Sequence, residues 1–162
     1  MNREFKILLY GYGNPGRKDD GLGPAVIDMV EKWIVQEKLK NIFVDSNYQL
    51  NIEDAYTIRD YDIVIFIDAS IEDIDDYMVT EVEPSDKVNY TMHSVSPSFI
   101  LHLCKKIYNY TPKTFLLHIK GYEFELEEGF SEKATNNLNL AFEFIKKTVR
   151  EFKFGKEALN AS

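Results

Sequence analysis

The chain has 162 residues, of which 44% are hydrophobic and 28% are charged, which is typical of one globular domain and excludes a disordered or collagen-like protein. Its formal net charge of -8 has the wrong sign for a protein that binds nucleic acid by neutralising phosphates. A single cysteine excludes an intrachain disulfide or a cysteine-rich zinc site, and no signal peptide or membrane span is apparent, so we expect a cytoplasmic protein.

The N-terminal half of the chain alternates strands with helices. Short apolar runs and helical spacing predict, in chain order, a strand over 5–10, a helix from 24 to about 38, a strand over 42–44, a helix over 53–59 and a strand over 63–67. Pro24 suits the first turn of its helix, after a loop over 11–20. The second and third strands are almost entirely apolar, so we expect them to be covered on both faces and to end at Asp45 and Asp68.

The C-terminal half adds two strands and two helices after an acidic turn. The expected elements are, in chain order, an edge strand over 77–82, a helix from 96 to 107, a strand over 113–119 and a closing helix from 131 to about 152. Leu103 and Ile107 belong to the apolar face predicted for the first of these helices. The sum is a three-layer α/β/α domain over 1–154 with a mostly parallel sheet of about five strands, followed by a flexible tail over 155–162.

Polar side chains gather at the carboxyl ends of the predicted strands, where ligands bind in folds of this class. Asp20 lies in the loop after the first strand, Asp68 ends the third, and His93 lies in the loop before Ser96. Two carboxylates and an imidazole suit nickel or zinc, so these three residues form a candidate metal site. For either aspartate alone, a role as a helix cap or turn former is the alternative. His118, near a strand end, stays unassigned.

The glycine-rich loop after the first strand supports a different interpretation, a nucleotide-binding module. Gly11, Gly13 and Gly16 match the pattern G-x-G-x-x-G, and Asp45 stands where such folds place the acid that binds a ribose. Against this interpretation, residues 17–20 separate the glycines from the helix that would hold the phosphates, and two of the four are aspartates. This alternative stays open.

The same loop carries a resemblance to a known family. Residues 11–24, Gly-Tyr-Gly-Asn-Pro-Gly-Arg-Lys-Asp-Asp-Gly-Leu-Gly-Pro, closely resemble the opening motif of the nickel-iron hydrogenase maturation proteases, and the resemblance extends to 67–69 (Ile-Asp-Ala) and 93–97 (His-Ser-Val-Ser-Pro). These enzymes are endopeptidases that remove the C-terminal extension from a hydrogenase large-subunit precursor after nickel insertion. The resemblance implies that Asp20, Asp68 and His93 hold nickel, and that the nickel arrives with the precursor.

The resemblance therefore implies a cytoplasmic, metal-dependent endopeptidase whose partner is the hydrogenase large-subunit precursor; we expect a monomer. The candidate catalytic and nickel-ligating residues are Asp20, Asp68 and His93, and the candidate substrate-binding residues are Gly13, Asn14 and Asp45. Turn capping is an equal alternative for Asp45. Peptidyl-tRNA hydrolases also carry a Gly-Asn-Pro-Gly loop, but the histidine and asparagine expected downstream are missing and the negative charge disfavours a tRNA partner.

Overall fold

The sheet has five strands, and its order is β2-β1-β3-β5-β4 in the computed structural model, which describes residues 5–87 and 95–154. The strands are β1 (Ile7–Tyr12), β2 (Ile42–Asn47), β3 (Ile63–Ser70), β4 (Tyr77–Glu81) and β5 (Lys113–Lys120). The first three, with β5, pair in parallel, and β4 pairs antiparallel with β5 at the edge. The mostly parallel sheet of five strands, with the fourth at an edge, is therefore confirmed.

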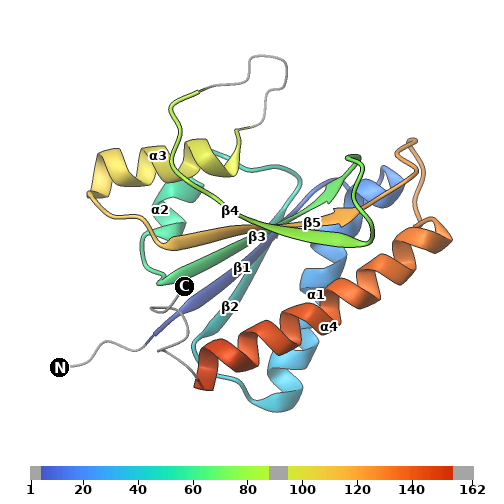
Figure 1. Cartoon of the computed structure of the whole chain (residues 1–162), viewed down its shortest axis with the longest axis horizontal. Helices are drawn as coiled ribbons and strands as arrows, with labels where there is room; N and C mark the ends of the chain where they lie inside the picture. The colour runs from blue at the N-terminus through green and yellow to red at the C-terminus, as the bar shows by residue number, and fades with distance from the viewer. Residues whose placement is uncertain (1–4, 88–94, 155–162) are drawn as a thin grey trace.

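Helices cover both faces of this sheet, which confirms the three-layer α/β/α class (Figure 1). They are α1 (Leu22–Glu37), α2 (Asp54–Ile58), α3 (Pro97–Tyr108) and α4 (Glu132–Phe154), and the 3-10 turn η1 (Lys18–Gly21) leads into α1. Helices α1 and α4 lie on one face, and α2 and α3 lie on the other. Within residues 5–87 and 95–154, no helix has the length and apolar character needed to cross a membrane.

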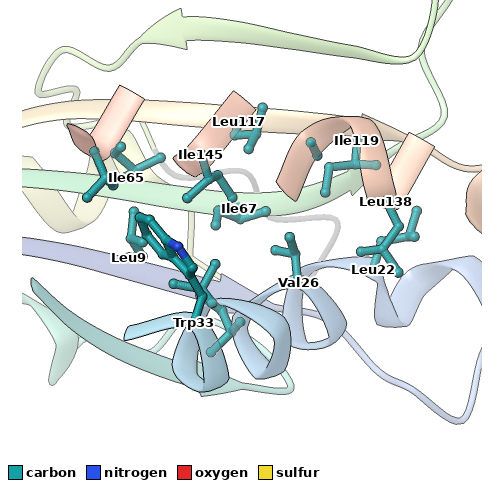
Figure 2. Packing of buried hydrophobic residues seen from close by; sticks show 14 of the residues in the cluster. Leu9, Leu22, Val26, Trp33, Ile65, Ile67, Leu117, Ile119, Leu138 and Ile145 are labelled. Atoms are coloured by element: carbon teal, nitrogen blue, oxygen red, sulfur yellow. The ribbon is translucent and has the colours of Figure 1, made fainter. Parts of the chain in front are cut away.

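The larger part of the hydrophobic core lies between the sheet and the layer formed by α1 and α4. Figure 2 shows Leu9, Ile67 and Leu117 from three neighbouring strands packing against Val26 of α1 and Ile145 of α4. All five side chains are almost fully buried, and burial of a large aliphatic side chain contributes about 1.5–3 kcal/mol to folding. This packing fixes the start of α1, and η1 before it, over the carboxyl ends of β1 and β3.

The other face of the sheet buries a polar pair within its apolar packing. The hydroxyl of Tyr10 on β1 donates to both carboxylate oxygens of Asp54, at 3.1 and 3.0 Å, and the backbone N–H of Asn51 donates to the same carboxylate at 2.8 Å. Burial raises the pKa of Asp54. These bonds attach the start of α2 to the sheet beneath the carboxyl ends of the strands.

Several predicted boundaries differ from the observed ones. Helix α1 begins at Leu22 rather than Pro24, because η1 continues directly into it. Strand β2 continues past Asp45 to Asn47, and β3 continues past Asp68 to Ser70. Backbone pairing with the neighbouring strands carries both extensions after the apolar side chains stop. Asp45 and Asp68 therefore lie within strands rather than at their ends.

Two predictions about burial are wrong. Strand β2 is not covered on both faces, because it forms one edge of the sheet and its residues from Asp45 to Asn47 are exposed. Ile107 is 62% exposed, since the buried face of α3 consists of Ile100, Leu101 and Cys104 and does not extend to the last turn. Leu103 is partly buried against this core. The tail expected over 155–162 lies outside the described residues.

Candidate functional site

The loop after β1 folds back on itself around the Asp20 carboxylate. Gly13 has a φ of +142°, and a Cβ at this position would overlap the backbone oxygen of Asp20, so only glycine fits. The next residue, Asn14, donates its backbone N–H to Oδ2 of Asp20 at 2.8 Å. The glycine thus permits the close approach, and the asparagine N–H then fixes the position of the carboxylate.

The backbone amides of this loop are already bonded within the protein. The N–H of Gly13 donates to the carbonyl of Asn47 at 3.1 Å, and the N–H of Gly16 donates to Oδ1 of Asn14 at 2.9 Å. With the Asn14 amide bonded to Asp20, the amides of Gly13, Asn14 and Gly16 all have partners within the protein rather than being left to bind phosphate. These contacts weigh against the nucleotide-binding interpretation.

Asp19, directly before Asp20, points into the protein and joins η1 to the loop over 121–131. Its buried carboxylate accepts bonds from the backbone amides of Tyr122, Glu123 and Ser131 at 2.7, 3.0 and 2.9 Å, and from the Ser131 hydroxyl at 2.7 Å. In Figure 1 this contact lies where the blue segment before α1 meets the orange loop after β5. Asp19 therefore anchors the turn from which Asp20 projects.

These hydrogen bonds also set the ionisation of Asp19. Burial raises the pKa of its carboxyl, but the four bonds from Tyr122, Ser131 and Glu123 together outweigh burial and lower the pKa below its ordinary value. Asp19 is therefore charged at neutral pH, and its carboxylate accepts all four hydrogen bonds in the ionised form. Lys18 provides a second attachment to the same loop, because its Nζ lies 3.1 Å from Oε1 of Glu123.

Asp68 on β3 is a half-buried carboxyl near Asp20. Burial, and then the charge of Asp20, raise its pKa from 3.8 to about 7, although hydrogen bonds from the Ala69 amide and the Tyr12 hydroxyl lower it. The pKa of Tyr12 is raised well above its ordinary value, first by burial and then by the charge of Asp68, so its hydroxyl keeps its proton. The structure therefore brings Asp20 and Asp68 close enough to repel each other.

His118, which the sequence left unassigned, lies beside Asp68 in the sheet. The two residues are partners in the parallel register of β3 and β5, so their side chains share a face. Nε2 of His118 lies 2.9 Å from the Thr80 hydroxyl on β4. Burial lowers the pKa of His118, which keeps its imidazole neutral at pH 7. His118 therefore lies at the edge of the candidate site and is oriented by the outermost strand.

Of the three candidate metal ligands, the structure describes the two carboxylates, Asp20 and Asp68. Within residues 5–87 and 95–154, no cluster of three His, Cys, Asp or Glu side chains has the geometry to hold a metal ion. His93, the third candidate ligand, lies outside these residues. Carboxylate oxygens suit a divalent cation, and two of them leave coordination positions for ligands from another molecule. The donors that the structure describes therefore fit a shared cation better than an enclosed structural one.

A pocket adjoins the glycine loop, whose Gly13 lies against the backbone of Asp20. It has a volume of about 240 Å³, and its lining residues come from the glycine loop, the start of α1 and the end of β2: Gly13, Pro15, Pro24, Ser46, Asn47 and Tyr48. Asp45, a candidate substrate-binding residue, is exposed and accepts the Ser46 N–H on its Oδ1 at 2.8 Å, within β2 and not in a turn. Of the other two candidates, Gly13 lines the pocket and Asn14 holds Asp20. Substrate binding by the three stays a prediction.

Sequence reasoning assigned no role in the site to Asp19 and did not consider Tyr12. The doubled aspartate at 19 and 20 was a signal that one of the two serves a structural purpose, but the donors to Asp19 lie more than a hundred residues away. Tyr12 follows the alternation of β1, which places it on the same face as Tyr10. The predicted strand ended at residue 10, whereas β1 continues to Tyr12, so the sequence-based prediction placed Tyr12 in a loop.

Comparisons with known proteins find similar folds among solved structures but no match by sequence. No protein-family model and no curated protein matches the sequence. Among solved structures, the chain is similar to the [NiFe] hydrogenase maturation protease HycI from Thermococcus kodakarensis KOD1, with 17% identity, coverage of 90% of this chain and 92% of that chain, and a TM-score of 0.73. It is similar to the hydrogenase maturating endopeptidase HybD from E. coli, with 16% identity, coverage of 91% and 93%, and a TM-score of 0.71.

A third solved structure, the hydrogenase 2 maturation peptidase from Thaumarchaeota archaeon SCGC_AB-539-E09, shares 20% identity over 89% of this chain and 97% of that chain, with a TM-score of 0.65. These matches cover about nine-tenths of the chain. The chain therefore has the fold of the nickel-iron hydrogenase maturation proteases.

Proposed function

We propose that the chain is an endopeptidase that removes the C-terminal extension of a nickel-iron hydrogenase large-subunit precursor after that precursor has received nickel. The observation that carries the proposal is the pairing of Asp20 and Asp68 at the carboxyl ends of β1 and β3, in a fold shared with enzymes of that description. The protein acts as a cytoplasmic monomer, and nickel belongs to its substrate.

The electrostatics of the two carboxylates support recognition of a cation. Asp20 and Asp68 repel each other, as the raised pKa of Asp68 indicates, and a divalent cation between them would relieve that repulsion. The Asn14 amide holds Asp20 in place, and Tyr12 interacts with Asp68, so little ordering remains to be done when a cation arrives. With His93, these side chains complete the coordination of nickel already held by the precursor.

Docking to nickel positions the peptide to be cleaved. A precursor whose nickel binds Asp20 and Asp68 has its adjoining chain held beside these two side chains. A carboxylate oxygen that the nickel leaves free is placed to act as the general base toward the attacking water. A precursor without nickel lacks the contact that orients it, which makes nickel insertion a condition for cleavage.

The test is the nickel dependence of cleavage. Purified precursor, loaded with nickel or free of it, is incubated with the protein, and loss of the C-terminal extension is followed by mass spectrometry. We expect cleavage of the nickel-loaded precursor only, and a fall of at least about a hundredfold in rate for His93→Ala, since a positioned proton-transfer or ligand group typically contributes 10²–10⁴-fold. Equal cleavage of both precursors would contradict the proposal, and a normal rate for His93→Ala would remove that residue from it.

A further inference from the structure

We infer that the free edge of β2, together with the pocket at its end, binds an extended segment of the substrate peptide and takes one apolar side chain of that segment into the pocket. This inference rests on the proposed function and adds to it a site for the peptide, separate from the carboxylates that meet the nickel. The occupant is the chain of the precursor close to the bond that is cleaved. Three features of the structure support it.

The first feature is a strand edge with unused backbone groups. Strand β2 pairs only with β1 among the residues that the structure describes. The carbonyls of Asn41 and Asn47 point toward β1, because they accept the amides of Ile7 and Gly13 at 3.0 and 3.1 Å. Backbone groups alternate in direction along a strand, so those of Val44 and Ser46 point away from the sheet.

Of these outward-facing backbone groups, the N–H of Ser46 has a hydrogen-bond partner and the groups of Val44 do not, within the residues that the structure describes. The Ser46 N–H is bonded to the side chain of Asp45 at 2.8 Å, whereas no bond to the N–H or C=O of Val44 is found within residues 5–87 and 95–154. A donor and an acceptor on one residue, facing outward from a strand, match the backbone of an added strand. The Asp45 cap limits this edge to a short stretch, which protects it from indiscriminate pairing.

The second feature is the pocket where the edge ends. Its volume of about 240 Å³ is bounded by two prolines, a glycine and Tyr48, whose side chain is 70% exposed. Ser46 and Asn47 of β2 form part of the same wall, so a peptide laid along the edge reaches the pocket directly. Walls of this composition suit a large aliphatic or aromatic side chain rather than a charged one.

The third feature is the position of the pocket relative to the carboxylates. Gly13 lines the pocket and lies against the backbone of Asp20, so an occupant of the pocket adjoins the candidate catalytic loop. Parallel strands lie about 4.8 Å apart, so a peptide added to β2 lies three strand spacings, or about 14 Å, from β3 and Asp68. About four extended residues cover that distance. The edge and pocket therefore recognise residues a few positions away from the bond that is cleaved.

The experiment compares two variants with a matched control in cleavage of nickel-loaded precursor. Val44→Pro removes the outward N–H, a change that an edge strand tolerates, and Ser46→Tyr fills the pocket from an exposed position. Val35→Tyr adds the same ring on the outer face of α1, where Val35 is 74% exposed. Thermal unfolding first establishes that each variant folds. If Val44→Pro does not fold, the comparison of Ser46→Tyr with Val35→Tyr decides the question.

We expect both β2 variants to raise KM about tenfold while kcat changes less than about twofold, because they remove binding that is equal in the ground and transition states. Val35→Tyr should behave as the unmodified protein. Unchanged KM in the folded β2 variants overturns the inference and leaves the proposed function standing. Failure of the unmodified protein to cleave the nickel-loaded precursor overturns the proposed function, and the inference falls with it.

Discussion

Replacement of Asp19 with alanine is expected to lower the free energy of unfolding by about 3 kcal/mol, because it leaves buried donors without an acceptor. The carboxylate is fully buried and accepts four hydrogen bonds, from the backbone amides of Tyr122, Glu123 and Ser131 and from the Ser131 hydroxyl. Without it, η1 loses its buried side-chain attachment to the loop over 121–131 and keeps the Lys18–Glu123 ion pair and the backbone bonds of residues 18 and 19. Urea unfolding at pH 7 measures the loss, with Asp73→Ala, an exposed carboxylate, as the control.

The loss should depend on pH in a defined direction. The hydrogen bonds lower the pKa of Asp19 in the folded protein, so the folded state binds its proton less readily than the unfolded state. The part of the stability that depends on the charge of Asp19 is therefore complete above its ordinary pKa of 3.8 and is lost as the pH falls through the lower folded value. The unmodified protein and Asp19→Ala should approach each other in stability below pH 4. A loss no larger than that of Asp73→Ala at pH 7 would contradict this role.

Replacement of Asp68 with asparagine is expected to have the opposite effect and to stabilise the protein by about 1–3 kcal/mol at pH 8. Burial and the charge of Asp20 raise the pKa of Asp68 to about 7, which means that folding disfavours its ionised form. Asparagine has nearly the same shape and does not ionise, so the repulsion from Asp20 disappears. A site that binds a cation typically carries such a cost in stability.

The sign of the pH dependence follows from the raised pKa. Between pH 3.8 and about 7 the folded protein holds a proton on Asp68 that the unfolded chain has released, so stability falls as the pH rises through this window. The advantage of Asp68→Asn should therefore be absent near pH 4 and complete above pH 7. Unfolding in urea at pH 4, 6 and 8 measures it. A gain that is the same at all three values, or a loss at pH 8, would show that the raised pKa has been misassigned.

The parallel sheet was predictable because short apolar runs that stop abruptly are typical of buried strands. The same signal does not distinguish a central strand from an edge strand, so β2 was wrongly expected to be covered on both faces. Strand ends were placed too early, since Asp45 and Asp68 end the apolar runs while backbone pairing continues to Asn47 and Ser70. Where a strand ends depends on its partners, which are distant in sequence.

The part of the candidate site that was predictable from the sequence is the approach of Asp20 to Asp68, because the order of the strands determines it. Asp20 and Asp68 follow or lie within neighbouring parallel strands, and their approach follows from that placement. Which of the two adjacent aspartates turns inward depends on the loop over 121–131, which no local pattern connects to residue 19. His93 stays a prediction, because it lies outside the described residues.

The central claim, that Asp20 and Asp68 together receive the nickel of the precursor, is tested most directly by cleavage of nickel-loaded precursor with Asp20→Asn, Asp68→Asn and the exposed control Asp73→Asn. The account predicts that both site variants fold, that Asp68→Asn is the more stable protein at pH 8, and that each cleaves at least about a hundredfold more slowly than the control. Cleavage by either folded site variant within a few-fold of Asp73→Asn would contradict it.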